Sequence, residues 1–92
     1  TSTKAMFVNY GEAEAFYAMK AIVALRKRGI KVELYPDNAK IGKQFTHLDK
    51  RNIPFAVIAG ESEIKAQKFA LKNMTSGEQI EVTFEQLFEK LK

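Results

Sequence analysis

The sequence predicts a three-layer α/β/α domain with a mixed five-stranded sheet and the element order β-α-β-α-β-β-β-α. Three observations lead to this fold class. Segments with helical spacing of apolar residues alternate with short runs typical of strands. One central run, IPFAVIAG, is nearly all apolar, as in a parallel strand covered on both faces. Near the end, two alternating segments flank a short turn that contains Gly, which predicts an antiparallel hairpin.

The first strand and helix follow from a change of hydrophobic period near residue 11. Residues 4–10 form a short apolar run, which predicts a buried strand ending in a turn at Gly11. Over residues 12–28 apolar side chains recur every three or four positions, as on one face of a helix. Gly29 then stands where a left-handed residue often ends a helix.

The next segment predicts a second strand and a second helix. Residues 30–35 alternate strictly between apolar and polar, which is typical of a strand at or near a sheet edge. Pro36, Asp37 and Asn38 interrupt this strand and offer an N-cap for a helix over 39–52. The apolar strand over 53–60 follows. Strands joined by helices in this way usually lie parallel.

The last third of the chain predicts antiparallel pairing and a closing helix. We expect strands over 67–72 and 79–82, because both alternate and residues 74–77 form a turn between them. Thr83 and Gln86 match the capping-box pattern that begins a helix. The final helix places four apolar residues on one face, namely Phe84, Leu87, Phe88 and Leu91.

The composition is that of one folded domain. The 92 residues suffice for a single core, so we expect one domain over 1–92, with residues 1–3 at its boundary. The absence of cysteine excludes a disulfide framework, a Cys zinc site and thiol catalysis. The apolar runs are far shorter than the roughly 20 residues that span a bilayer. We therefore expect a cytoplasmic domain without a membrane partner.

The net charge of +4 is concentrated in the middle of the chain. Residues 20–51 carry nine basic and three acidic side chains, a net +6, while each flanking segment sums to −1. A basic region of this kind favours an anionic partner. The alternative is a lysine-rich surface that only keeps the domain soluble.

Part of this charge lies along one face of the second predicted helix. At 100° per residue, a polar stripe forms from Lys40, Lys43, His47 and Lys50, with Gln44 and Arg51 at its margin. A separate apolar stripe, which docks the helix on the sheet, contains Ile41, Phe45 and Leu48. Aligned lysines suit a phosphate backbone, because they neutralise phosphates and release counterions. A solvated helix face is the alternative.

Tyr10, Gly11 and Glu12 lie where the first strand passes into the first helix. Ligands of open α/β sheets bind at the carboxyl ends of the strands. Helix N-termini attract anions, and an aromatic side chain there can stack on a base. The alternative is a plain turn in which Gly11 relaxes the backbone.

The residues show no catalytic or metal-binding set. His47 is the only histidine, and no carboxylate lies at ligand spacing around it. Glu61 and Glu63 have no recognisable acid–base partner, so we expect both to be solvated. We therefore expect a binding module for a polyanion, with neither a cofactor nor a metal.

Three stretches carry a resemblance to a known family. The first is YGEAEA at 10–15 with LRKRGIKV at 25–32, the second is GKQF at 42–45, DK at 49–50 and IPFAVIAGESE at 53–63, and the third is LKNMTSGEQ at 71–79. With them the chain resembles the C-terminal anticodon-binding domain of class IIa aminoacyl-tRNA synthetases, most closely the histidyl-tRNA synthetases. Two positions depart from that family. It often has Ala in place of Leu48, and Gly in place of Lys68.

The resemblance implies recognition of the anticodon loop of a histidine tRNA. The parent of such a domain ligates histidine to the tRNA with ATP and Mg, as a cytoplasmic homodimer, while the domain itself lacks the catalytic motifs and is no enzyme alone. The fold position then indicates an RNA-binding set of Tyr10, Gly11, Glu12, Lys40, Lys43, Gln44, His47, Lys50 and Lys68.

Two other functions remain open at this stage. The same fold in a synthetase-like paralogue could serve protein interaction or dimerisation, with Tyr35 or Phe69 buried across a subunit contact. A small α/β enzyme would require a pocket that gathers Glu61, Glu63 and His47.

Overall fold

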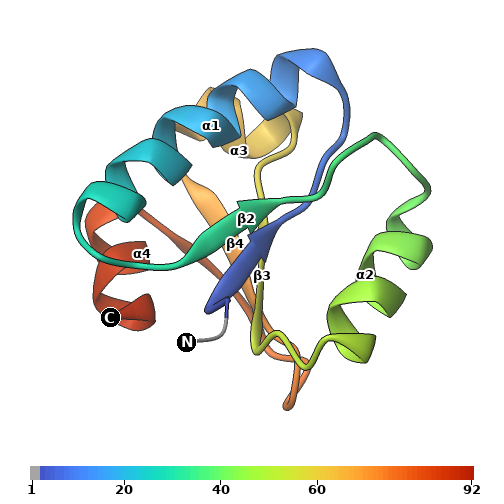
Figure 1. Ribbon diagram of the computed structural model, residues 1–92. Coiled ribbons are helices and arrows are strands. Elements are labelled where there is room, and N and C mark those ends of the chain that lie inside the picture. Colours follow the sequence, from blue (N-terminus) through green and yellow to red (C-terminus); the bar gives the residue numbers. More distant parts are fainter. Residues whose placement is uncertain (1–2) are drawn as a thin grey trace.

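The structure, a computed structural model, describes residues 3–92 (Figure 1). Its elements follow one another as β1 (Ala5–Phe7), α1 (Glu12–Lys27), β2 (Val32–Leu34), α2 (Ile41–Lys50), β3 (Phe55–Ile58), α3 (Glu61–Ala66), β4 (Phe69–Asn73), β5 (Gln79–Val82) and α4 (Phe84–Leu91). The predicted order is confirmed, with α3 as an additional short helix. The expected boundary at residues 1–3 falls largely outside the described residues.

The five strands form one mixed sheet in the order β2-β1-β3-β4-β5. β1 is parallel to both β2 and β3, whereas β4 is antiparallel to β3 and to β5. The predicted fold class is therefore confirmed. Because β1 and β3 are parallel neighbours, their carboxyl ends meet at one edge of the sheet, where α1 and α3 begin.

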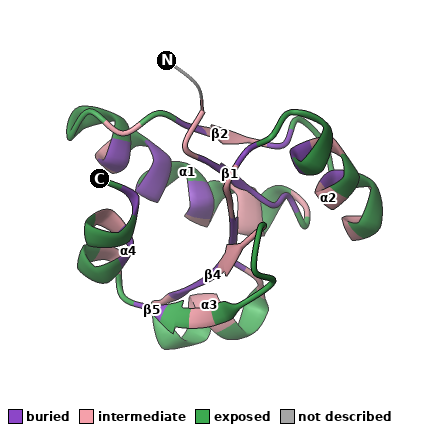
Figure 2. Cartoon of the chain, turned by 90° about the horizontal axis from the view of Figure 1, so that it is seen from below, coloured by how far each residue is buried: buried purple, intermediate pink, exposed green. Residues whose placement is uncertain are grey.

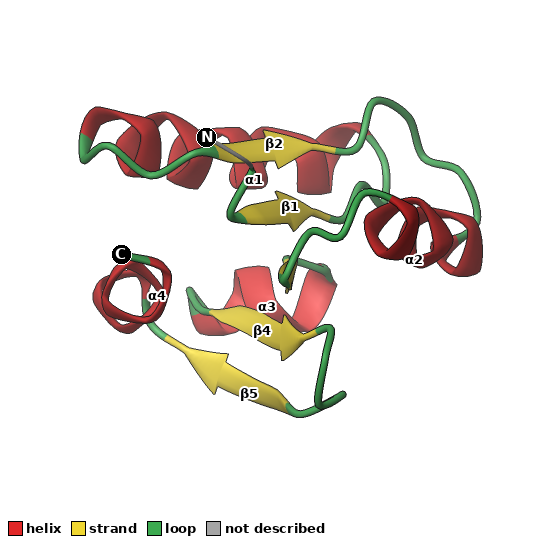
Figure 3. Cartoon of the chain, turned by 60° about the horizontal axis from the view of Figure 1, so that its bottom comes forward, coloured by secondary structure: helices red, strands yellow, loops and turns green. Residues whose placement is uncertain are grey.

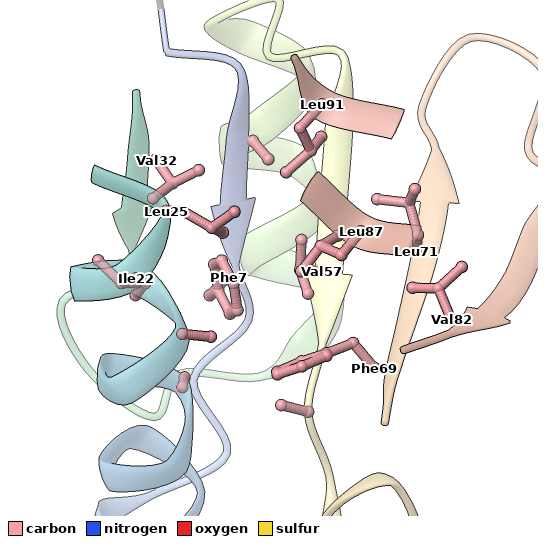
Figure 4. Close-up of a cluster of buried hydrophobic side chains, with 14 residues drawn as sticks. Phe7, Ile22, Leu25, Val32, Val57, Phe69, Leu71, Val82, Leu87 and Leu91 are labelled. Atoms are coloured by element: carbon pink, nitrogen blue, oxygen red, sulfur yellow. The ribbon is translucent and has the colours of Figure 1, made fainter. Parts of the chain in front are cut away.

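α1 and α4 cover one face of the sheet and enclose the larger core. Phe7 of β1 and Val57 of β3 pack with Ile22 and Leu25 of α1 and with Leu87 of α4 (Figure 4). All five side chains are fully buried. The helix sides turned toward the sheet are buried and the outer sides are exposed (Figure 2). This apolar burial is the main contribution to stability.

α2 covers part of the opposite face. Its Leu48 is fully buried against Met6 of β1, Ala56 of β3 and Tyr35. In Figure 3, α2 lies at the right of the sheet and α4 at the left. Lys72 of β4 pairs with Ala56 and with Gln79 of β5, so all three share this face. Lys72 is half-buried and Gln79 is exposed, which leaves a polar strip of sheet beside α2.

Two predicted helix ends are confirmed. Gly29 has a φ of 85° after α1, in the left-handed region. At the start of α4, the Gln86 amide donates to the Thr83 hydroxyl at 3.2 Å, and the Thr83 amide donates to the Gln86 side chain at 2.9 Å. Arg28 joins these two helix ends through two 2.8 Å hydrogen bonds to the Glu85 carboxylate.

The segment after β3 differs from the prediction. Glu63, expected to be solvated, accepts a 2.8 Å hydrogen bond from the Gly60 amide and thereby caps α3, a helix that the sequence did not predict. Gln67 ends α3 with a left-handed φ of 57°, so β4 begins at Phe69 rather than at residue 67. Six residues are too few to show a helical period.

The start of α2 also differs from the prediction. The helix begins at Ile41 with Lys40 as its N-cap, two residues later than expected. The Asp37 carboxylate accepts a 3.0 Å hydrogen bond from the Ala39 amide, so it shapes the preceding loop and does not cap the helix. Along residues 3–92, no helix combines the length and the apolar character needed to cross a membrane.

Candidate RNA interface

An open groove of about 790 Å³ lies at the carboxyl edge of the sheet, where β1 and β3 end. Its walls come from the β1–α1 turn, the start of α3, the flank of α2 and the polar strip of β4 and β5. The lining residues are Tyr10, Glu14, Phe45, Ile58, Gly60, Glu61, Ser62, Glu63, Lys72 and Gln79. The groove therefore combines aromatic, carboxylate, amide and ammonium groups on one concave surface.

Tyr10 stands in one wall of the groove and is 41% exposed. Its ring lies against Gly60, where a Cβ atom would be 3.7 Å from the Tyr10 ring and 3.0 Å from the Glu63 carboxylate. Burial first, and then the negative charge of Glu63, raise the pKa of the Tyr10 hydroxyl. The phenol is therefore protonated at neutral pH and can donate a hydrogen bond while its ring offers a stacking surface.

Phe45 of α2 and Lys72 of β4 meet on the other side of the groove. The Lys72 Nζ lies 4.6 Å from the centre of the Phe45 ring, within the range of a cation–π interaction. The sequence did not indicate either residue as part of a binding site. Phe45 belongs to the apolar stripe that was expected to dock α2 on the sheet. Its polar position in an alternating strand could have indicated that Lys72 lies on an open face of the sheet. The sequence did not show, however, that α2 leaves β4 uncovered.

Gln44 does not lie at the margin of an exposed stripe, as the sequence suggested. Its side chain is fully buried, accepts a 2.8 Å hydrogen bond from the Asn9 amide and donates at 2.8 Å to the carbonyls of Asn9 and Ala39. Asn9 in turn donates to the Tyr35 carbonyl at 2.9 Å. Gln44 is therefore closed to direct contact with RNA and instead ties α2 to the turn that carries Tyr10.

The basic stripe occupies the flank of α2 opposite the groove. Lys40, Lys43 and Lys50 are exposed, and none of the three forms an ion pair with any residue from 3 to 92. His47 is half-buried, with its ring 5.4 Å from that of Tyr35 and nearly perpendicular to it. At 100° per residue these positions lie on the far side of the helix from Phe45. The structure therefore does not bring the stripe and Tyr10 into one site.

Arg51, at the margin of the stripe, is engaged in an ion pair. Its guanidinium donates two 2.8 Å hydrogen bonds to the Glu33 carboxylate on β2. These bonds, with a further one from the Thr3 hydroxyl, lower the pKa of Glu33 to about 2. The pair anchors the C-terminal end of α2 to the edge strand of the sheet.

Gly11 and Glu12 do not line the groove. Gly11 has a φ of 130°, which favours glycine, and its amide donates to the Asn9 side chain at 2.9 Å, so it shapes the turn. Glu12 is exposed and borders a separate hollow on the outside of α1. Glu14, which sequence reasoning did not single out, faces the groove instead.

Lys68 lies over the polar strip but outside the groove lining. Its Nζ is 3.7 Å from the Glu81 carboxylate on β5, and its carbonyl accepts a 3.0 Å hydrogen bond from the Tyr17 hydroxyl. Glu81 pairs with Ala70 and so shares the face of the polar strip. Lys68 therefore places its ammonium group at the rim of the surface that contains the groove.

The structure does not assemble the alternative sites. His47 packs on Tyr35, while Glu61 and Glu63 line the groove beyond α2, so the three do not share a pocket. In the described part of the chain, no three His, Cys, Asp or Glu side chains are grouped as metal ligands would be. Tyr35 and Phe69 are 7% and 5% exposed, buried within their own chain and not free for a subunit contact.

Comparison with known proteins identifies close relatives. Residues 4–92 match the family described as "Anticodon binding domain". The chain is 57% identical over 90 residues, 98% of its length, to a histidine–tRNA ligase of Flavobacterium johnsoniae. It superimposes with a TM-score of 0.91 on histidyl-tRNA synthetase from Nostoc sp. PCC 7120, at 37% identity over 98% of this chain.

The chain spans only part of these relatives, 19% of the Flavobacterium ligase and 22% of the Nostoc chain. A further likeness, to the RNA binding domain of threonyl-tRNA synthetase from Cryptosporidium parvum, concerns the fold alone. It has a TM-score of 0.89 at 24% identity and covers 97% of this chain and 22% of that one. Synthetases named for two different amino acids thus share this fold.

Proposed function

Because the chain belongs to the anticodon-binding domain family, we propose that it is the tRNA-recognition domain of a histidine–tRNA ligase. The high identity to proteins of that name over nearly the whole chain supports this assignment. The parent would ligate histidine to its tRNA in the cytoplasm as a homodimer. Its catalytic residues and its sites for ATP and Mg would lie outside this chain.

The groove is suited to unstacked bases of the anticodon loop, and its geometry carries the proposal. Single-stranded RNA loops are recognised by stacking on aromatic rings and by hydrogen bonds to base edges. Tyr10 and Phe45 supply rings, and the carboxylates of Glu61 and Glu63 can accept hydrogen bonds from base amino groups. Lys72 supplies a cation for a base carbonyl or a phosphate in the same groove.

The basic stripe would bind the phosphate backbone beside that loop. Lys40, Lys43 and Lys50 point away from the groove on the other flank of α2, with His47 as an additional hydrogen-bonding group. A helix with its side chains is only about 10–12 Å across, so one RNA loop can contact both flanks. Lys68, at the rim of the polar strip, is the remaining basic residue of the proposed set.

Calorimetric titration of the 92-residue chain tests this function. The partners are a histidine tRNA and a copy that differs only in its anticodon. Tighter binding to the histidine anticodon is expected. The exposed turn variant Thr75→Ala should bind as the unaltered chain does, because Thr75 lies outside the groove and the stripe. Absence of binding to either tRNA at low salt would overturn the proposal and favour a protein-interaction domain.

A further inference from the structure

α1 carries an exposed apolar stripe that no other part of residues 3–92 covers. Phe16, Met19 and Val23 are 69%, 37% and 46% exposed. Spaced by three and four residues, they lie on one side of the helix. Within residues 3–92, the only other large apolar side chain with comparable exposure is Tyr10, in the groove.

This α1 stripe is separate from the helix face that builds the core. The buried side of α1 is formed by Ala18, Ala21, Ile22 and Leu25. Beside the stripe, an open hollow of about 630 Å³ is lined by Glu12, Ala13, Ala15, Phe16 and Met19. Contiguous exposed apolar surface of this kind usually marks an interaction site.

Basic side chains border the α1 stripe. The Lys20 Nζ lies 5.1 Å from the centre of the Phe16 ring, and Lys27 is exposed one turn beyond Val23. The Arg26 guanidinium donates to the Val32 carbonyl instead, and Glu12 lines the hollow at the start of the helix. A complementary partner surface would be apolar at its centre and acidic at its rim. RNA is not such a partner. Its phosphates could contact the basic side chains, but they would not fill the apolar centre of the stripe.

The α1 stripe also lies away from the basic stripe of α2. α1 packs on one face of the sheet and α2 on the other (Figure 1). A partner on the outside of α1 would therefore leave the basic stripe of α2 open to tRNA. The relatives are about five times as long as this chain, which spans 19% of the Flavobacterium ligase, so most of such a protein must be accommodated next to this domain.

We propose that Phe16, Met19 and Val23 dock this domain on the remainder of its parent polypeptide, on an apolar patch with acidic groups opposite Lys20 and Lys27. This proposal rests on the proposed function, because it requires a longer parent. Docking removes the three side chains from water and fixes the orientation of the groove relative to the rest of the parent. The domain retains tRNA binding of its own without this contact.

Methionine oxidation by hydrogen peroxide, followed by mass spectrometry, tests the docking. In the isolated chain Met19 should oxidise readily, since it is 37% exposed, whereas Met6, at 1%, should resist. In the full-length parent, Met19 should lose most of its reactivity, while Met6 and the half-buried Met74 should behave as before. Equal reactivity of Met19 in both proteins would overturn the proposal.

The substitution Phe16→Glu provides the matched variant. In the parent it should restore Met19 oxidation toward the rate of the isolated chain, and Thr75→Glu, on an exposed turn, should not. In the isolated chain, Phe16→Glu should leave the melting temperature and tRNA affinity unchanged, so a docking failure is distinguishable from a failure of the proposed function. Concentration-dependent protection of Met19 in the isolated chain would instead identify a second copy as the occupant and overturn the proposal.

Discussion

At the scale of single residues, the turn that carries Tyr10 depends on the buried amide of Gln44. Gln44 makes three hydrogen bonds of 2.8 Å, two of them to the backbone of Asn9 next to Tyr10. Among the described residues, no buried polar side-chain atom lacks a partner. The polarity of Gln44 thus supports the proposed RNA surface from within, without reaching it.

The variant Gln44→Leu tests this role. It keeps the size of the side chain but leaves the Asn9 amide and carbonyl without partners, which should lower the free energy of unfolding by about 1–3 kcal/mol. It should also weaken tRNA binding, because Tyr10 loses its fixed position. Urea unfolding and calorimetric binding measure the two effects. The control Thr46→Ala removes an exposed hydroxyl of the same helix, and equal stability of both variants would contradict the account.

For Tyr10, the ring and the hydroxyl can be separated by substitution. Tyr10→Ala should cost about 1–3 kcal/mol of tRNA binding, the usual contribution of an aromatic ring stacked on one base, whereas Tyr10→Phe should retain most of the affinity. Since its pKa is raised, the phenol remains neutral, and the contribution of Tyr10 should not change between neutral and mildly alkaline pH. Binding titrations at both pH values provide the measurement; a full loss in Tyr10→Phe would show that stacking is not the main term.

The positions of single residues were predictable only where their place along the chain decides where they lie in the fold. Tyr10 follows a strand, so its position at the carboxyl edge of the sheet was foreseeable. Gln44 lies on the helix between polar and apolar stripes, and either side was possible. Its burial depends on Asn9, which is 35 residues away, and a single sequence does not reveal that contact.

At the scale of elements, α2 separates two surfaces that we expect to act on different parts of the RNA. Phe45 faces the groove, while the basic stripe faces away from it. Base contacts specify sequence and phosphate contacts position the RNA. The helical period predicted the stripe, but the side of α2 that borders the groove follows from packing against β1 and β3.

Charge reversal on the basic stripe tests whether it binds phosphates while the groove binds bases. The double variant Lys43→Glu/Lys50→Glu should weaken binding of all tRNAs alike, and the slope of log affinity against log salt should become less steep by about two. Both side chains are exposed and unpaired within residues 3–92, so the fold should persist. Binding isotherms at several salt concentrations supply the slope, and Lys90→Glu on α4 is the control. An unchanged slope would contradict the role of the stripe.

The ion pair between Arg51 and Glu33 predicts a pH effect on stability. The pKa of Glu33 is about 2 in the folded chain against a usual 4.5. The folded state therefore favours the charged carboxylate, and this stabilisation is present above pH 4.5 and lost as the pH falls toward 2. Glu33→Gln should lower the melting temperature by only a few degrees at neutral pH, because both partners are more than a third exposed. The difference in melting temperature between Glu33→Gln and the unaltered chain should shrink in acid. A difference that grew in acid would contradict a stabilising role of this ion pair.

At the scale of the whole molecule, the fold was predictable because several independent signals agree. The apolar run of β3, the helical period of α1 and the capping box of α4 each indicate their element. The groove was not predictable in the same way. It is formed by the β1–α1 turn, α2, α3 and two strands, and it exists because α2 covers β1 and β3 but leaves β4 and β5 open.

The central claim is that the groove distinguishes anticodons while the stripe only holds the RNA. The most direct measurement is the ratio of affinities for a histidine tRNA and for its anticodon-swapped copy, determined for the unaltered chain, for Tyr10→Ala and for Lys43→Glu/Lys50→Glu. We predict that Tyr10→Ala brings this ratio close to one, because a base no longer held on the Tyr10 ring loses its edge contacts to Glu61 and Glu63. The double charge reversal should weaken both affinities and preserve the ratio. A ratio that survives in Tyr10→Ala and disappears on charge reversal would contradict the account.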